Sequence, residues 1–479
     1  MSKKTKLPEE VVCKKGDRIE LEIIDMGTEG EGIGRYKGYT LFVKDALPGD
    51  KVKVLVMKTK KRFGYARLME ILVSSKDRVK PKCPTARACG GCQLQHCSYE
   101  AQLHFKANKV KDCLERIGGI SDDYVMEPIL AMDEPFYYRN KAQFPVGMDK
   151  EGNLVTGFYA GRSHQIIENT DCPIQHPCNG VIIEAVLKFM REYGISSYDE
   201  VVHKGLVRHI LTRVGVQTGE VMVCLVINGT SLPHAEELVA RLRALSLPSK
   251  ERQAKPLQIK SICLNTNQEK TNAILGKEVQ VLYGKDYIED SIGDVKFRIS
   301  PLSFYQVNPE QTKKLYDTAL EYADLQGGEV VWDLYCGIGT ISLFLAQKAK
   351  QVYGVEIVPE AIEDARTNAE LNHMDNVEFY VGAAEDVVFK KYQEGGEALK
   401  ADVVTLDPPR KGCDEKLLET VVKMEPKRIV YVSCDPATLA RDVKYLVAQG
   451  YEVKKVRACD MFGMSYHVET VVGLQRKSM

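Results

Sequence analysis

The last third of the chain alternates short β-rich runs with segments of helix length. The four runs cover residues 330–335, 352–357, 402–407 and 428–433. Such alternation is typical of parallel strands joined by crossover helices. It therefore predicts an α/β domain with a doubly wound parallel sheet at residues 301–479.

The turn after the first of these runs has the features of a nucleotide site. Gly337 and Gly339 let the backbone pass close to a ligand, and the helix that follows favours a carboxylate or phosphate at its N-terminus. The second run carries Glu356 at its tip, where a carboxylate can accept hydrogen bonds from both ribose hydroxyls. The longer dinucleotide fingerprint is absent, so a mononucleoside such as S-adenosylmethionine fits better than NAD.

A stiff turn with the sequence LDPPRKG follows the third run. The paired prolines after Asp407 restrict the chain, so its carboxylate is expected to point into the crevice at the strand ends. Similar turns with an aromatic fourth residue serve methyltransferases of the adenine amino group. Arg410 takes that fourth place here, which argues against an amino-group substrate.

A cysteine stands where the fourth run gives way to a helix. The N-terminus of a helix favours a thiolate, so Cys434 is predicted to be a nucleophile that faces the same crevice. Carbon 5 of a pyrimidine takes a methyl group once a thiolate has added at carbon 6, and a base must then remove the carbon 5 proton. Glu469 is the candidate base, and His467 is the weaker rival.

Six motifs occur in one order along the chain: SFYQVN at residues 303–308, then DLYCGIGT, GVE, LDPPR, VSCDPATLARD and HVET. Together they resemble the RNA uracil-5-methyltransferase family. The resemblance implies a Rossmann-like class I methyltransferase domain that methylates carbon 5 of uridine with S-adenosylmethionine. It makes Cys434 the nucleophile and Glu469 the base, and it places Phe304 in the uracil pocket. The implied cofactor contacts are Gln306, Tyr335, Gly337, Gly339, Thr340, Glu356 and Asp407.

Residues 1–75 contain five short strand-like runs separated by glycine turns. This pattern predicts a small closed barrel, OB-like and similar to a TRAM domain, which is an RNA-binding module. The stretch from Lys51 to Arg67 has seven basic residues and no acidic one, with Phe63 and Tyr65 among them. Such a face can follow a phosphate backbone and stack bases, although a solvated lysine-rich hairpin has the same charge pattern.

Residues 76–300 are predicted to form an α+β central domain that carries clustered cysteines. The chain has fourteen cysteines, and a reducing cytosol argues against a disulfide framework. The spacing of Cys83, Cys89 and Cys92 resembles the cluster motif of the ribosomal-RNA members, whose fourth thiolate lies downstream, here at Cys172. Spacing alone allows a [4Fe-4S] cluster or zinc, and the resemblance favours the iron-sulfur cluster in a structural or RNA-positioning role. Two further cysteines remain alternative ligands, Cys97 and Cys178.

Charge and targeting features indicate a cytoplasmic protein. Sixty-six basic residues balance sixty-six acidic ones, so the net charge gives no direct information about a polyanionic partner. The N-terminus MSKKTKLPEE lacks the apolar core of a signal peptide, and no run of about 18 apolar residues follows. We therefore expect no membrane contact and no obligate protein partner.

The expected substrate is RNA whose target base leaves its stack to reach the thiol, most easily from a loop. The resemblance favours 23S ribosomal RNA, because bacterial transfer-RNA members generally lack both the barrel and the cluster. Transfer RNA is the alternative, since archaeal-type members blur that distinction. Three other hypotheses stay open: a cytosine-5-methyltransferase, an RNA-binding ribosome-assembly factor with a vestigial site, and a zinc-bound redox sensor.

Overall fold

Five strands near the N-terminus close into a small barrel in the order β1-β2-β3-β5-β4. Buried and exposed residues alternate along β1, so one face of the strand fills the barrel and the other meets solvent. Leu41, Val43 and Val52 are fully buried inside it. The predicted N-terminal barrel is confirmed. Its strands are β1 (Arg18–Met26), β2 (Gly32–Tyr36), β3 (Tyr39–Lys44), β4 (Lys51–Thr59) and β5 (Phe63–Val73).

Strands β4 and β5 form the hairpin that carries the basic stretch. Its turn is exposed and holds Lys60, Lys61 and Arg62. Beside it, the ring of Phe63 contacts those of Phe42 and Tyr65 edge-on, at centroid distances of 5.6 Å and 5.7 Å. Aromatic rings and lysines therefore share the outer surface of the barrel, as base stacking on a basic face requires.

The computed structural model describes residues 12–121, 124–161, 163–250, 255–395 and 400–477. The chain divides into two units, residues 1–105 with 464–466 and residues 106–463 with 467–479. Helix α1 (Tyr99–Cys113) begins in the first unit and continues in the second, where a π-helical turn, η1 (Leu114–Gly118), follows it. No helix within the described ranges is long and apolar enough to cross a membrane.

The middle of the chain folds around a seven-stranded sheet of order β13-β12-β11-β10-β7-β8-β9. Strands β10 and β11 are buried along nearly their whole length. Helix α2 packs on this sheet through Ile182, Val186 and Phe189, with α3 beside it. The elements are β7 (Lys141–Met148), β8 (Leu154–Tyr159), β9 (Ile166–Glu168), α2 (Cys178–Glu192), β10 (Val207–Val214), β11 (Glu220–Ile227), α3 (Ala235–Arg243), β12 (Gln258–Thr266) and β13 (Glu278–Gly284). A separate hairpin, β14 (Ile288–Ile292) and β15 (Val295–Ile299), follows.

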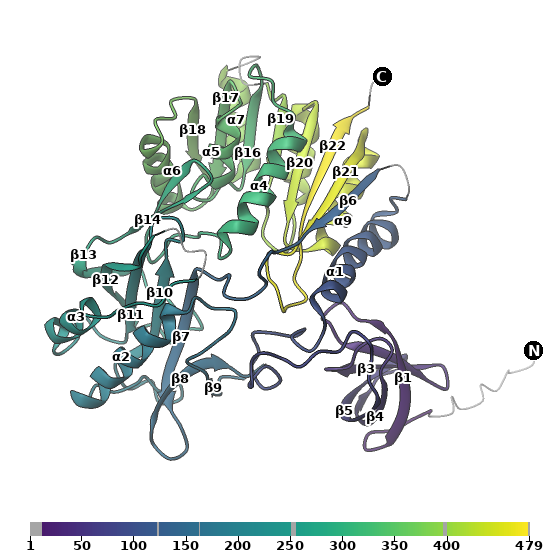
Figure 1. The fold of residues 1–479 in the computed structure, drawn as a ribbon. Helices are drawn as coiled ribbons and strands as arrows, with labels where there is room; N and C mark the ends of the chain where they lie inside the picture. The colour runs from purple at the N-terminus through teal and green to yellow at the C-terminus, as the bar shows by residue number, and fades with distance from the viewer. Residues whose placement is uncertain (1–11, 122–123, 162, 251–254, 396–399, 478–479) are drawn as a thin grey trace, which may run out of the picture. The chain divides into compact units, whose positions relative to one another are not determined.

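The C-terminal region is built on an eight-stranded sheet of order β18-β17-β16-β19-β20-β22-β21-β6 (Figure 1). Strands β16 to β20 pair in parallel. Apolar residues of α4, α5 and α6 belong to one core cluster, and those of α7, α8 and α9 to another, so helices cover both faces. The predicted Rossmann-like fold is confirmed. The elements are α4 (Pro309–Ala323), β16 (Val330–Leu334), α5 (Thr340–Ala346), β17 (Gln351–Glu356), α6 (Pro359–Leu371), β18 (Val377–Val381), α7 (Ala384–Gly395), β19 (Val403–Leu406), α8 (Glu415–Met424), β20 (Arg428–Ser433), α9 (Pro436–Ala448), β21 (Tyr451–Cys459) and β22 (Glu469–Arg476).

Four strands of this sheet, β18, β22, β21 and β6, lie outside the four predicted runs. Strand β22 runs antiparallel between β20 and β21. Strand β6 (Val125–Leu130) pairs with β21, although the sequence places residues 76–300 in the central domain (Figure 1). It is an edge strand without a fully buried residue, and it contains Pro128. Such a strand has little periodic signal, because an edge tolerates proline and exposure.

Candidate functional site

The carboxyl ends of the parallel strands bring most of the predicted site residues to one edge of the sheet. Tyr335 follows β16, Glu356 ends β17, Asp407 follows β19 and Cys434 follows β20. The strand order reverses between β16 and β19, and ligands of open α/β sheets bind at such a reversal. Because β22 is antiparallel to β20, its first residue, Glu469, lies at the same edge.

The register of β20 and β22 sets the candidate base opposite the candidate nucleophile. Ser433 pairs with Thr470. Continuing this register by one residue puts Cys434 opposite Glu469, at a Cα separation of about 5 Å for such pairs. The charge of Glu469 accordingly acts on the thiol of Cys434.

The turn after β16 needs its glycines for two different reasons. Gly339 has a φ of 81°, and a Cβ atom there would lie 2.9 Å from the ring of Phe379. Gly337 has a φ of 55°, and a Cβ atom there would meet no atom within 4 Å. Gly339 therefore permits close packing against Phe379, and Gly337 borders open space.

Backbone hydrogen bonds orient the Glu356 carboxylate at this turn. It accepts hydrogen bonds from the N–H of Gly337 at 3.3 Å and from the N–H of Val358 at 3.1 Å. Thr340, at the start of α5, shares a 2.9 Å hydrogen bond with the Tyr316 hydroxyl. Glu356 is thus held beside the open space, in an orientation that suits a ribose.

Two carboxylates belong to the strands between which the sheet order reverses: Asp333 lies on β16, and Asp407 directly follows β19. Asp333 is fully buried, and burial raises its pKa to about 6 although Ser342 and Thr405 donate hydrogen bonds to it. Burial, and then the charge of Asp333, raise the pKa of Asp407 to about 7. No side chain or backbone group in the described part of the chain donates a hydrogen bond to the Asp407 carboxylate. The fold therefore buries at this edge an acid whose ionised form is not stabilised by any donor in the described part of the chain.

The environment of Cys434 opposes the thiolate. Burial is the main cause of a pKa raised to about 11, and the charges of Glu469 and Asp407 add to it, while Arg410 acts in the opposite direction. Helix α9 does begin here, since the Asp435 side chain caps its first N–H groups. Burial and the two carboxylates therefore act against the helix N-terminus, which favours the thiolate.

Glu469 is a stronger base than its rival His467. Glu469 is 6% exposed, and burial, followed by the charge of Asp407, raises its pKa to about 8. Burial, followed by the charge of Arg410, lowers the pKa of His467 to about 4. A group with the higher pKa takes a proton more readily, so the opposite directions of these two pKa shifts favour Glu469 over His467.

Arg410 is a candidate functional residue that the sequence analysis used only to argue against another substrate. It is exposed in the turn after β19, and its charge acts on Cys434, Glu469 and His467. The signal was present in the sequence, because a residue three positions after Asp407 in a stiff turn must stay near the same sheet edge.

The segment that contains Phe304 and Gln306 is held by the central region. Arg213 of β10 is 2% exposed and donates a hydrogen bond to the carbonyl of Ser303. Asn140 donates a 3.1 Å hydrogen bond to the carbonyl of Gln306. These bonds fix the backbone, while the Phe304 side chain stays 71% exposed. An exposed ring on a fixed backbone suits stacking on a base.

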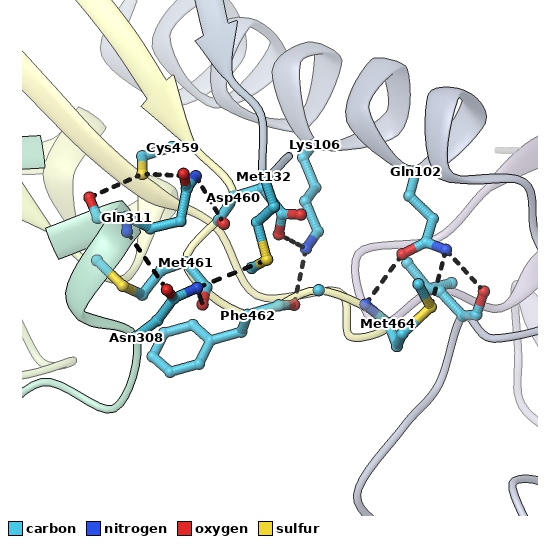
Figure 2. A network of polar contacts seen from close by, with 12 residues as sticks. Gln102, Lys106, Met132, Asn308, Gln311, Cys459, Asp460, Met461, Phe462 and Met464 are labelled. Carbon is cyan, nitrogen blue, oxygen red and sulfur yellow. Dashed lines mark hydrogen bonds and ion pairs between the residues drawn. The ribbon is translucent and has the colours of Figure 1, made fainter. Parts of the chain in front are cut away.

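A buried polar network connects the start of α4 to the segment that leads to Glu469 (Figure 2). Asn308 and Gln311 donate 3.1 Å hydrogen bonds to the carbonyls of Met461 and Asp460, respectively. Lys106 and Asp460 are both fully buried, and Lys106 Nζ lies 2.5 Å from the Asp460 carboxylate. Leaving one member of such a pair without its partner costs about 3–5 kcal/mol. The network therefore keeps this segment in one conformation.

Comparison with known proteins identifies the family. A profile of the tRNA (Uracil-5-)-methyltransferase family matches residues 264–477, and a TRAM domain profile matches residues 13–69. An uncharacterized RNA methyltransferase of Halalkalibacterium halodurans is 51% identical over 97% of this chain and 98% of its own. Another, from Clostridium tetani, is 50% identical over the same shares. The chain belongs to the RNA uracil-5-methyltransferase family.

One solved structure resembles this member of the uracil-5-methyltransferase family along most of its length. The tRNA (uracil-54, C5)-methyltransferase of Pyrococcus abyssi, in complex with S-adenosyl-L-homocysteine, is 29% identical. The match has a TM-score of 0.72 and covers 95% of this chain and 99% of that chain. The similarity therefore extends well beyond the methyltransferase fold itself.

The sheet edge of this uracil-5-methyltransferase fits a nucleoside sulfonium such as S-adenosylmethionine. Glu356 suits the ribose, and open space borders Gly337. Asp407 and Glu469 are carboxylates with raised pKa values and no hydrogen-bond donor among the described residues. A cationic ligand beside them would favour their ionised forms, which burial disfavours.

The structure does not support the predicted iron-sulfur cluster of this family member. Cys89 accepts a hydrogen bond from the N–H of Gly91 at 3.4 Å, and its pKa is raised by burial and by Cys83. Yet the described ranges contain no group of three or more His, Cys, Asp or Glu side chains arranged to hold a metal ion. Cys92 belongs to the first unit and Cys172 to the second. The four-cysteine set therefore stays a prediction of the sequence resemblance.

We expect alkylation of Cys434 in the free protein to be slow at pH 7. Its rate should rise about tenfold per pH unit toward pH 11, because only the thiolate reacts. Iodoacetamide labelling followed by mass spectrometry of the Cys434 peptide measures this rate. A plateau near pH 8 would contradict the environment described here.

Proposed function

We propose that this protein transfers a methyl group from S-adenosylmethionine to carbon 5 of a uridine in 23S ribosomal RNA. The observation that carries the chemistry is the meeting of Cys434, Glu469 and Asp407 at the edge where the sheet order reverses. A thiol opposite a carboxylate of raised pKa provides a nucleophile and a base on neighbouring strands. The basic hairpin of the barrel supports an RNA substrate.

The groups of this chain balance each step of the proposed reaction. Cys434 releases its proton to water and its sulfur bonds to carbon 6 of uracil, and the electrons of the carbon 5–carbon 6 double bond form an enolate whose carbon 5 is nucleophilic. S-adenosylmethionine would supply the methyl group by cleavage of its sulfonium–methyl bond, with neutral S-adenosylhomocysteine as the leaving group, and its positive charge would favour the thiolate while it is bound. Carbon 5 then carries the methyl group and its original hydrogen. Glu469 accepts that hydrogen as a proton, and the carbon–sulfur bond breaks to return the thiolate of Cys434.

The other residues of the site bind and orient. Phe304 is proposed to stack on the target base, and Arg410 holds positive charge beside the thiol. The residues proposed to contact the cofactor are Gln306, Tyr335, Gly337, Gly339, Thr340, Glu356 and Asp407. Arg213 and Asn140 hold the backbone of the segment that contains Phe304 and Gln306.

Transfer RNA is the second candidate substrate, and a specific observation favours it. The Pyrococcus abyssi protein acts on tRNA, and its match covers 95% of this chain, which must include much of residues 1–75. The barrel therefore does not by itself distinguish ribosomal from transfer RNA members. The ribosomal proposal rests on the sequence resemblance.

The deciding experiment offers both substrates to the purified protein. Unmodified 23S ribosomal RNA and bulk transfer RNA are incubated separately with labelled S-adenosylmethionine, and digested nucleosides are analysed by mass spectrometry. We expect 5-methyluridine in the ribosomal RNA. Product in transfer RNA alone would keep the chemistry and reject the ribosomal substrate, and 5-methylcytidine would reject uridine. No product in either RNA would reject the methyltransferase proposal.

The cysteine cluster stays a prediction of the sequence resemblance. The proposed ligands are Cys83, Cys89, Cys92 and Cys172, with [4Fe-4S] preferred to zinc. Iron, zinc and acid-labile sulfide are measured in protein purified without oxygen. About four iron and four sulfide per chain support the cluster. One zinc without iron, or no metal, would reject it.

A further inference from the structure

The VSCDPATLARD motif ends in two charged residues, Arg441 and Asp442, that the proposed chemistry does not use. Both lie on α9, which begins directly after Cys434 and its capping residue. Asp442 is 1% exposed, so its carboxylate is buried in the region behind the nucleophile. A buried carboxylate requires hydrogen bonds or an ion pair, and its partners show what it holds.

Asp442 joins three elements behind the site. One carboxylate oxygen accepts hydrogen bonds from the backbone N–H of Cys413 at 2.8 Å and from the Tyr431 hydroxyl at 2.7 Å. The other oxygen accepts one from Arg441 Nε at 2.8 Å. Tyr431 lies on β20, two residues before its end, and Cys413 ends the turn that starts at Asp407. One carboxylate therefore connects the strand, the helix and the turn that surround Cys434.

Arg441 holds the same turn from its other side. Its Nη2 donates hydrogen bonds to the carbonyls of Lys411 at 3.1 Å and Cys413 at 3.2 Å. One helical turn earlier, the Thr438 hydroxyl donates a 3.2 Å hydrogen bond to the carbonyl of Arg410. Residues spaced three and four apart share one helix face, so this face of α9 contacts the turn at successive points.

Gly412 shows how close this contact is. Its φ is 77°, and a Cβ atom there would lie 2.5 Å from Arg441 Nη2 and 2.6 Å from the Asp442 carboxylate. Only a residue without a side chain lets the turn approach the pair this closely.

We propose that Arg441 and Asp442 are positioning residues, which hold the 407–413 turn so that Arg410 and Asp407 keep a fixed relation to Cys434. The inference rests on the proposed role of Cys434 as nucleophile. The charged side chains that act on the thiol come from two elements, Glu469 from β22 and the other two from this turn. Release of the turn would move Arg410 and Asp407 away from their present positions. The pKa of the Cys434 thiol would then change.

The test uses Asp442→Asn and the milder Arg441→Lys, each compared with Arg476→Lys. Arg476 also pairs with a carboxylate, that of Glu425, but it lies at the opposite end of β22 from Glu469. Three quantities are measured for each protein: kcat and KM for methyl transfer, the pH profile of Cys434 alkylation by iodoacetamide, and the melting temperature. The alkylation assay needs neither RNA nor cofactor, so it does not depend on the proposed function.

We expect kcat of Asp442→Asn to fall about 100-fold, as for a catalytic group displaced by about 1 Å, with KM for S-adenosylmethionine changed less. Its Cys434 alkylation profile should shift along the pH axis, and Arg441→Lys should show both effects more weakly, while Arg476→Lys shows neither. If alkylation is unshifted and kcat per folded molecule is unchanged, the pair is structural only and the proposal is overturned. If Asp442→Asn does not fold, the same comparison is made with Arg441→Lys, where an unshifted profile and normal kcat also overturn it. If the unaltered protein transfers no methyl group while the variants still show a shifted pH profile of Cys434 alkylation, that result would reject the proposed function but support the positioning role.

Discussion

Cys434→Ala is expected to lower methyl transfer by roughly 10⁴-fold or more, because no other group in the reaction can form the bond to carbon 6. The same variant should form no adduct with RNA that contains 5-fluorouridine. Fluorine at carbon 5 cannot leave as a proton, so the unaltered protein should stall as a covalent complex that survives denaturing electrophoresis. Both results follow from one missing sulfur atom.

Cys224→Ala is a matched control for this experiment. Its thiol is fully buried on β11 of the central sheet, far in the sequence from every proposed site residue. It should methylate RNA and form the fluorouridine adduct normally. An adduct formed by Cys434→Ala would exclude Cys434 as the nucleophile, whatever its effect on turnover.

The second large effect is expected for Glu469→Gln, with turnover lowered about 1,000-fold, near the middle of the range for general base catalysis. The amide keeps the shape of the side chain but accepts no proton. Sulfur addition and methyl transfer can still occur, so methylated RNA should accumulate while bound to Cys434. Electrophoresis under denaturing conditions with labelled S-adenosylmethionine detects this complex.

Glu452→Gln serves as the control, since Glu452 lies on the neighbouring strand β21 with an exposed side chain that pairs only with Lys454 among the described ion pairs. It should release product at the normal rate. Free 5-methyluridine formed at a normal rate by Glu469→Gln would assign the base to another group, and His467 would then be the next to test.

Much of the site could be predicted because parallel strands share one edge. Glu356 and Asp407 lie at the ends of their β-rich runs and Cys434 directly follows one, so their common location follows from the alternation of strands and helices. Glu469 was reached through its motif, since β22 is antiparallel and does not follow that rule.

The electrostatic state of the thiol could not be predicted from its local sequence. A helix N-terminus favours a thiolate, and the residues around Cys434 contain no opposing charge except the capping Asp435. The opposing carboxylates come from positions 27 residues before and 35 residues after it, at Asp407 and Glu469. Only the tertiary fold brings these carboxylates to the thiol, and burial makes the largest contribution to its raised pKa.

Strand β6 and the Lys106–Asp460 pair were missed for a related reason. A short edge strand with a proline has no clear periodicity, and a buried lysine looks like a surface residue in a helix sequence. Both depend on partners more than 300 residues away. The predicted boundary near residue 300 consequently separates strands that belong to one sheet.

The antiparallel ladder between β20 and β22 has a consequence for how this protein can vary. Neighbouring residues on a strand face opposite sides of the sheet, so a shift of one position would turn Glu469 away from Cys434. Insertions or deletions of a single residue between Ser465 and Thr470 should therefore inactivate the protein even when every side chain is retained. Gene libraries that vary loop length should therefore lose activity when the length of this segment changes.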